Sequence, residues 1–313
     1  MQNKPGQAHF VAALEDTPVA AVDRLDENEK ARSTWADAWE SMRRRPTFWI
    51  SAVLILLIVV VALFPTIFTQ VDPRACDLNN SNGDPAAGHP FGFNRQGCDV
   101  YSRTIWGTQA SVTVGLLAAS IVTLFGIIVG ALAGYYGGWL DAVVSRIGDI
   151  FFAIPTVLGA IVLMTVIPER TALTVALVLS VFAWPQVARI MRGSVLSARN
   201  SDYVTASVAL GVSKAKILIR HVVPNAIAPV IVIATVSLGT FIVAEATLSF
   251  LGIGLPSNIM SWGNDIGQAR TSIRTSPQVL IYPSIALSIT VLSFLMLGDV
   301  VRDALDPKAR ARG

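Results

Sequence analysis

The sequence predicts an all-α polytopic membrane protein. Of its 313 residues, 53% are hydrophobic and only 14% are charged, a balance too apolar for the surface of a water-soluble globule. Six stretches are long enough to cross a hydrocarbon core of about 30 Å, which takes roughly 20 helical residues. They are residues 48–68, 111–134, 150–167, 171–188, 226–250 and 281–298. We therefore expect the lipid bilayer to surround a transmembrane domain over residues 48–303.

The positions of Lys and Arg predict how these spans are oriented. Short cytoplasmic segments retain positive charge. If the N-terminus is inside, segments 1–47, 135–149, 189–225 and 299–313 are inside and hold 18 of the 24 basic residues. We therefore expect both termini in the cytoplasm, with a short cytosolic tail over 304–313. The net charge of +3 is a topology signal and gives no reason to expect a nucleic-acid partner.

The first 47 residues contain two predicted segments. Residues 1–30 are polar and of mixed charge, which favours a disordered cytosolic tail and no cleaved signal peptide. Residues 31–47 favour an amphipathic helix in the headgroup layer, because Trp35 and Trp39 share one face with Met42 and arginines follow them. The alternative for 31–47 is a solvated tail.

The first outer loop, residues 69–110, contains both cysteines. Cys76 and Cys98 lie in a segment expected outside the cytoplasm, where a disulfide persists. Such a bond would close a loop of about twenty residues and stabilise it by roughly 3 kcal/mol in the entropic description. Two free thiols are the alternative, and a metal site is less favoured because His89 is the only nearby ligand type.

The third and fourth predicted spans follow each other closely. Residues 150–167 and 171–188 are separated only by Pro168, Glu169 and Arg170. Because proline breaks a helix, we expect a tight hairpin of two spans here rather than one long helix.

The polar segment 189–225 interrupts two apolar spans and predicts a stub helix. Asp202 is a suitable N-cap, and the helix is expected over Tyr203–Leu210. Gly211 then follows where a left-handed C-terminal cap is required. So short a helix needs a surface to lie against, and small side chains allow close approach: Ala206, Ser207 and Ala209. A plain loop with one helical turn is the alternative.

The chain after the stub is expected to return to the membrane. Ser213 is placed to cap a second helix that begins at Lys214 and runs towards Pro224. The fifth span then contains Glu245, the only ionisable residue in the six spans. A charge inside a membrane is costly and is often functional. Glu245 is therefore either part of a transport path or a buried acid bonded to a neighbouring helix.

Several kinds of chemistry are not expected on this chain. It has no phosphate-binding Gly-x-x-x-x-Gly-Lys-Ser/Thr loop, and its three histidines, His9, His89 and His221, lie on separate segments. We therefore expect no catalytic residue, metal or cofactor on the chain. Any dependence on ATP and Mg²⁺ would come from partner subunits.

Four motifs together resemble a known family. Asp202-Tyr-Val-Thr-Ala-Ser-Val-Ala-Leu-Gly-Val-Ser213, with Arg220-His-Val-Val-Pro-Asn225, resembles the cytoplasmic "EAA" loop of ABC importer permeases. Segments 35–46, 89–103 and 244–254 resemble the interfacial helix, first outer loop and fifth span of C-type permeases of oligopeptide and dipeptide transporters. The resemblance covers about residues 33–308. It departs at four positions: the family's usual Glu is Thr205, its second Ala is Ser207, and its Asp and Arg in the outer loop are Asn94 and Cys98.

The resemblance implies the type I ABC importer permease architecture and its function. In that architecture segment 189–225 would be the cytosolic region that couples to the ATPases, and residues 69–110 and 251–280 would be the outer loops. The implied partners are a second permease, two ABC ATPases that bind ATP and Mg²⁺, and an extracytoplasmic binding protein. The implied location is the bacterial cytoplasmic membrane and the implied cargo is peptide. An ion-coupled carrier, a permease for nickel or another small solute, and a membrane scaffold remain alternatives.

Overall fold

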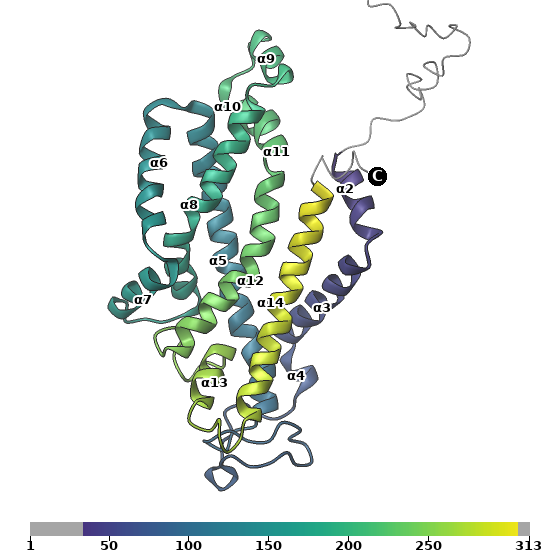
Figure 1. The fold of residues 1–313 in the computed structure, drawn as a ribbon, viewed down its shortest axis with the longest axis vertical. Helices are drawn as coiled ribbons and strands as arrows, with labels where there is room; N and C mark the ends of the chain where they lie inside the picture. The colour runs from purple at the N-terminus through teal and green to yellow at the C-terminus, as the bar shows by residue number, and fades with distance from the viewer. Residues whose placement is uncertain (1–33, 306–313) are drawn as a thin grey trace, which may run out of the picture.

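The computed structural model describes residues 34–305, which form helices joined by loops (Figure 1). The predicted tail at 1–30 and residues 306–313 lie outside this part of the chain. The helices are α2 (Thr34–Arg43), α3 (Pro46–Leu63), α4 (Pro65–Phe68), α5 (Val100–Tyr136), α6 (Gly138–Ala153), α7 (Thr156–Val166), α8 (Ala172–Ala198), α9 (Asp202–Ala209), α10 (Lys214–Ile217), α11 (Val223–Ala226), α12 (Ala228–Phe250), α13 (Trp262–Ala269) and α14 (Gln278–Leu305). A short 3₁₀ turn covers Leu78–Asn80 and a π-helical turn covers Leu218–Val222.

Five of these helices, α3, α5, α8, α12 and α14, are each long and apolar enough to cross a membrane. A sixth candidate span is bent: α6 and α7 meet at an angle of 87°. The prediction of one continuous helix over 150–167 was therefore wrong. The break falls at Ile154 and Pro155, because proline donates no backbone N–H and disfavours helical geometry in the residue before it.

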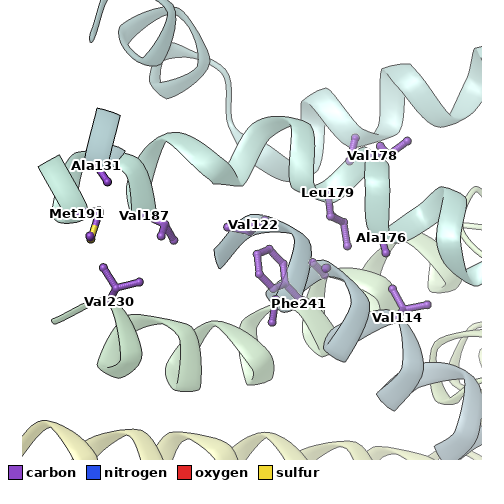
Figure 2. Packing of buried hydrophobic residues seen from close by; sticks show 14 of the residues in the cluster. Val114, Val122, Ala131, Ala176, Val178, Leu179, Val187, Met191, Val230 and Phe241 are labelled. Carbon is purple, nitrogen blue, oxygen red and sulfur yellow. The ribbon is translucent and has the colours of Figure 1, made fainter. Parts of the chain in front are cut away.

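The core lies where α5, α8 and α12 pack together (Figure 2). The most extensive helix contact is α5 against α8, and glycines on α5 allow the backbones to approach. At Gly126, an added Cβ would lie 2.6 Å from the Cβ of Val187, and at Gly130 it would overlap the carbonyl oxygen of Ala188. Small residues on one helix therefore set the distance between the two.

Replacing Gly130 with alanine is expected to lower the free energy of unfolding by about 1–3 kcal/mol, since the added methyl group must push the α8 backbone away. Thermal unfolding of the purified chain in detergent measures the change. The matched control is Gly193→Ala on α8, where an added Cβ meets no atom within 4 Å and helix propensity improves. Equal behaviour of the two variants would contradict close packing at Gly130.

The two ends of the molecule differ in what they contain. One end holds α2, α9 and the C-terminal part of α14, and the other holds the loop that follows α4 together with α13 (Figure 1). At the first end, an ion pair between Arg45 and Asp303 joins the chain after α2 to the end of α14. The segments expected on the cytoplasmic side thus gather at one end of the helices.

Candidate functional site

Helix α9 protrudes at the end that also holds α2, and α10 and α11 connect it to α12 (Figure 1). Within α9 only Val204 is buried. Three larger apolar side chains are exposed, Tyr203, Val208 and, at 83%, Leu210. Because exposed apolar groups gathered on one short helix and its C-cap favour contact with another molecule, α9 has the character of a docking element.

The start of α9 differs from the prediction. Ser201, and not Asp202, occupies the N-cap position, and its side chain makes no capping hydrogen bond. Asp202 is the first helical residue, where its charge faces the positive end of the helix dipole. Thr205 consequently stands at the fourth helical position, and its hydroxyl donates to the Ser201 carbonyl oxygen at 3.5 Å. Val204, rather than Thr205, therefore occupies N3, the position from which a Glu side chain would reach back to the N-cap N–H.

The end of α9 has the predicted glycine cap at Gly211. The helix itself ends one residue before the expected boundary at Leu210. The helix ends at Ala209, with Leu210 as C-cap, and Gly211 has a φ of 75°. The Gly211 N–H donates to the Val208 carbonyl at 2.9 Å, and the Val212 N–H donates to the Ser207 carbonyl at 3.2 Å. This pair of bonds is a Schellman motif, in which glycine adopts the left-handed conformation without strain.

The return to the membrane contains a feature that the sequence did not indicate. Ser213 is at the N-cap position of α10, but its side chain makes no capping bond. The chain then makes a π turn, in which the Val223 N–H reaches the Leu218 carbonyl. Pro224 lies in α11 and has no N–H to donate. The helical hydrogen-bond pattern therefore changes register between the protruding segment and α12. Such π turns often occur at functional sites.

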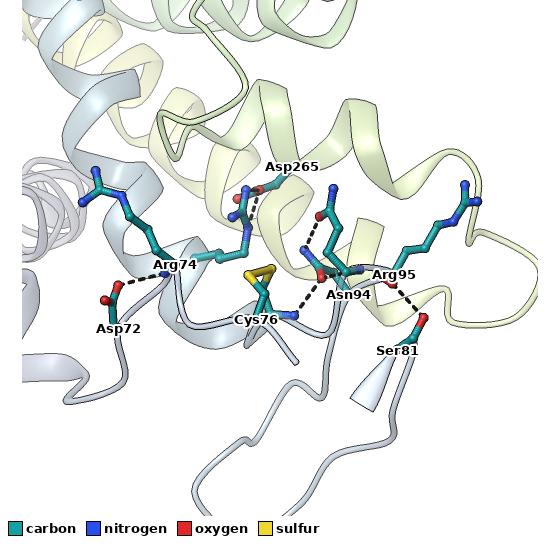
Figure 3. The surroundings of a disulfide bond; sticks show 10 residues. Asp72, Arg74, Cys76, Ser81, Asn94, Arg95 and Asp265 are labelled. Carbon is teal, nitrogen blue, oxygen red and sulfur yellow. Dashed lines mark hydrogen bonds and ion pairs between the residues drawn. A yellow bond between two sulfur atoms is a disulfide. The ribbon is translucent and has the colours of Figure 1, made fainter. Parts of the chain in front are cut away.

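The opposite end is organised by the loop between α4 and α5. Cys76 and Cys98 are joined by a disulfide with a Cα–Cα distance of 4.1 Å (Figure 3). The Asn94 side-chain oxygen accepts hydrogen bonds from the N–H groups of Gln96 and Cys98, both at 2.9 Å. Gly97, between them, has a φ of 74° and lies against the Asp77 carbonyl, where no Cβ fits. Asn94 and Cys98, two departures from the family pattern, thus fix this turn.

A buried ion pair ties this end to α13. Arg103, in the first turn of α5, donates from Nε and Nη2 to the Asp265 Oδ1 atom at 2.8 and 2.5 Å. Both side chains are more than nine-tenths buried. Burial raises the pKa of the Asp265 carboxyl, and the Arg103 guanidinium acts in the opposite direction. Sequence reasoning did not find this pair, because the partners are 162 residues apart.

Glu245 lies inside the helix packing of this chain. It is fully buried on α12, where its two carboxylate oxygens accept hydrogen bonds from Ser111 on α5 at 2.8 Å and Ser249 at 2.7 Å. Ser111 also accepts a 3.3 Å bond from the Trp262 N–H, which begins α13. Of the two predicted alternatives, this arrangement favours the structural one, because each carboxylate oxygen accepts a hydrogen bond, one from α5 and one from α12 itself.

Replacing Glu245 with alanine is expected to cost about 1–3 kcal/mol of stability, because two serine hydroxyls lose their acceptor. Glu245→Gln preserves the shape and keeps one acceptor oxygen for a serine hydroxyl, while its amide N–H₂ can donate to the other serine oxygen, so it should cost clearly less. Thermal unfolding in detergent compares the two. A stability loss that is the same for both would show that the hydrogen bonds are unimportant.

Two family models match the chain. The binding-protein-dependent transport system inner membrane component matches residues 126–311, and the N-terminal transmembrane domain of oligopeptide transport permease C matches residues 33–85. The chain therefore belongs to the family of inner-membrane components of binding-protein-dependent transport systems. Members of this family are permease subunits of ABC transporters, in which separate ATPase subunits hydrolyse ATP.

Individual relatives agree with the family models. The oligopeptide transport permease OppC of Bacillus subtilis strain 168 is 35% identical over 310 residues, 99% of this chain and 100% of the relative. The glutathione transport permease GsiD of Escherichia coli O6:K15:H31 is 35% identical over 300 residues, 96% of this chain and 97% of the relative. The dipeptide transport permease DppC of Alkalihalophilus pseudofirmus is 32% identical over 283 residues, 90% and 92% of the two chains.

A solved structure supports the predicted architecture. A chain of the MetNI methionine ABC transporter, in an inward-facing conformation, matches with a TM-score of 0.53. The match has 24% sequence identity and covers 64% of this chain and 96% of that chain. At this identity the likeness bears on the fold alone, and it agrees with the type I importer permease fold predicted from the sequence motifs.

Proposed function

We propose that this chain is the membrane-embedded permease subunit of an ATP-driven importer that carries oligopeptides or dipeptides into the cell. The observation that carries the proposal is the 35% identity to an oligopeptide transport permease over essentially the whole of both chains. The relatives named for dipeptide and glutathione transport are also permeases of small peptides. The chain supplies no catalytic residue or cofactor. ATP and Mg²⁺ bind to its partners.

The proposed partners are a second permease, two ABC ATPases and an extracytoplasmic binding protein. The exposed residues Tyr203, Val208 and Leu210 support α9 as the ATPase contact. Closure of the ATPases on ATP would move α9, and the helices joined to it would rock as a body to switch access across the membrane. The π turn before α12 lies on this connection.

A cavity within the helices supports a path for the cargo. Its volume is about 410 Å³, and it is lined from α8 by Gln186 and from α12 by Ser237 and Thr240, among largely apolar residues. Hydroxyl and amide groups within membrane-spanning helices suit contact with peptide bonds, which carry donors and acceptors. We propose that this face forms one side of the path and that the second permease forms the other.

We place the chain in the bacterial cytoplasmic membrane with both termini in the cytoplasm. The support is the charge bias, with 18 of 24 basic residues on segments expected inside. The gathering of α2, α9 and the end of α14 at one end of the molecule is consistent with this orientation (Figure 1).

Crosslinking tests the proposal. Cys76 and Cys98 are first replaced by serine, and single cysteines are then introduced at residues 205–210. The ATPase is prepared as a set of variants, each with one cysteine on its membrane-facing surface. We expect disulfides to form between some of these pairs. Peptide uptake should depend on the ATPases and persist when the ion gradient is collapsed. Uptake that collapses with the ion gradient and does not need the ATPases would support an ion-coupled carrier. If cells instead need the chain to take up nickel or another small solute for growth, that solute is the cargo in place of peptide.

A further inference from the structure

A cavity of about 460 Å³ lies beneath the disulfide-bonded loop, at the end of the molecule opposite α9. Its walls come from the loop, the start of α5, α13 with the segment after it, and the start of α14. The loop contributes Asn94 and Arg95, the start of α5 contributes Arg103, and α13 contributes Asp265 and Gln268. Figure 3 shows Asn94, Arg95 and Asp265 around the disulfide. A volume of this size is ordinary for a small-molecule site.

Two hydrogen-bond acceptors on the α13 wall have no donor. They are the Asp265 Oδ2 atom and the Gln268 Oε1 atom, and both are buried. The Asp265 side chain is nine-tenths buried, and Arg103 engages only its other oxygen, Oδ1. A buried acceptor without a donor costs about 1–3 kcal/mol. These two atoms therefore favour a ligand that brings N–H groups into the cavity.

The charges of the lining restrict what that ligand is. Arg95 and Arg103 carry two positive charges and Asp265 carries one negative charge. A metal ion is disfavoured, because Asp265 supplies the one carboxylate among the residues that line the cavity, whereas a metal site needs several charged or oxygen ligands. Arg95 is exposed and free to pair with a carboxylate. The lining thus suits a molecule with an ammonium group at one end and a carboxylate at the other.

We propose that this cavity binds the zwitterion of a free amino acid or short peptide. The ligand's ammonium group donates to Asp265 Oδ2 and Gln268 Oε1, and its carboxylate pairs with Arg95. The bound molecule bridges α13 and the disulfide-bonded loop. The site is separate from the cavity proposed as the transport path, because the two cavities share no lining residue.

Titration of glycylglycine into the full-length chain in lipid nanodiscs, followed by calorimetry, tests the proposal. We expect saturable binding that empty nanodiscs do not give. N-acetylglycylglycine lacks the ammonium group and glycylglycinamide lacks the carboxylate, so each should bind at least about tenfold more weakly. If the cavity holds only water, or receives a side chain of a docking protein, glycylglycine gives no saturable binding at millimolar concentration and the proposal is overturned.

Two variants and two matched controls locate the site. Gln268→Leu and Arg95→Gln should each weaken glycylglycine binding about tenfold. Gln278→Leu and Arg274→Gln make the same changes outside the cavity and should leave binding unchanged. Equal affinity of all four variants would place the binding elsewhere and overturn the assignment. Peptide uptake by cells is measured separately, so that failure of the site and failure of the proposed transport function give different results.

Discussion

Replacing Leu210 with aspartate is expected to reduce ATP-driven peptide uptake at least about tenfold while the helices remain folded. Leu210 is 83% exposed at the tip of the protruding segment, so the folded chain loses almost nothing. Burial of a leucine side chain against an ATPase would contribute about 1.5–3 kcal/mol, and each 1.4 kcal/mol is a factor of ten. Aspartate removes that contribution and adds a charged carboxylate, which would have to be desolvated in the contact with the ATPase.

Uptake, ATP hydrolysis and thermal unfolding should be measured on the same variant in proteoliposomes with all partner subunits. Leu210→Met is the control, because methionine keeps the apolar character and similar volume and should retain most of the activity. Unchanged uptake in Leu210→Asp would show that the tip of α9 does not contact the ATPase. A lower unfolding temperature would show that the loss of uptake arises from misfolding.

The sequence predicted the protruding segment well because its signals are local. Gly211 follows a short helix-forming run, and a left-handed glycine cap depends on only a few neighbouring residues. The start was predicted one residue late, because Ser201 and Asp202 are both good N-caps and the sequence does not rank them. The π turn at Leu218–Val222 could not be predicted, because it depends on how the return helix packs against α8.

The membrane spans show the limits of a hydropathy pattern. Apolar length located α5, α8, α12 and α14, but α5, α8 and α14 extend beyond the predicted stretches because polar residues continue a helix outside the hydrocarbon core. The predicted first span, 48–68, was wrong at its end, because the helix stops at Leu63 and Pro65 begins the separate helix α4. The bend between α6 and α7 was missed although Pro155 is visible in the sequence, because prolines also occur within continuous helices such as α8 at Pro185. Only tertiary packing decides between a kink and a break.

The outer end was predicted only in part. The disulfide was predicted as one of two alternatives, because both cysteines lie in one loop expected outside the cytoplasm, where a disulfide persists. The Arg103–Asp265 pair had no such signal. Each residue alone looked like an ordinary loop charge, and the contact forms only because α13 packs against the start of α5.

Replacing Arg103 with alanine is expected to destabilise the chain by about 3–5 kcal/mol, because Asp265 is left as an uncompensated charge in a nine-tenths buried position. The loss should appear as a lower unfolding temperature. It should also appear as faster proteolysis at the outer end, because α13 and the first turn of α5 would lose their charged connection. Asp265→Ala leaves the guanidinium buried instead, and it should cost a similar amount.

The double variant Arg103→Met with Asp265→Leu separates the cost of an unpaired charge from the value of the pair. A buried ion pair often contributes little more than apolar residues of similar volume, because desolvation offsets the attraction between the charges. We therefore expect the double variant to recover most of the stability that either single variant loses. If it is as unstable as Arg103→Ala, the pair itself stabilises the contact between α5 and α13. Because both charges also line the cavity under the disulfide-bonded loop, recovered stability combined with lost glycylglycine binding would show that the charges serve the ligand rather than the fold.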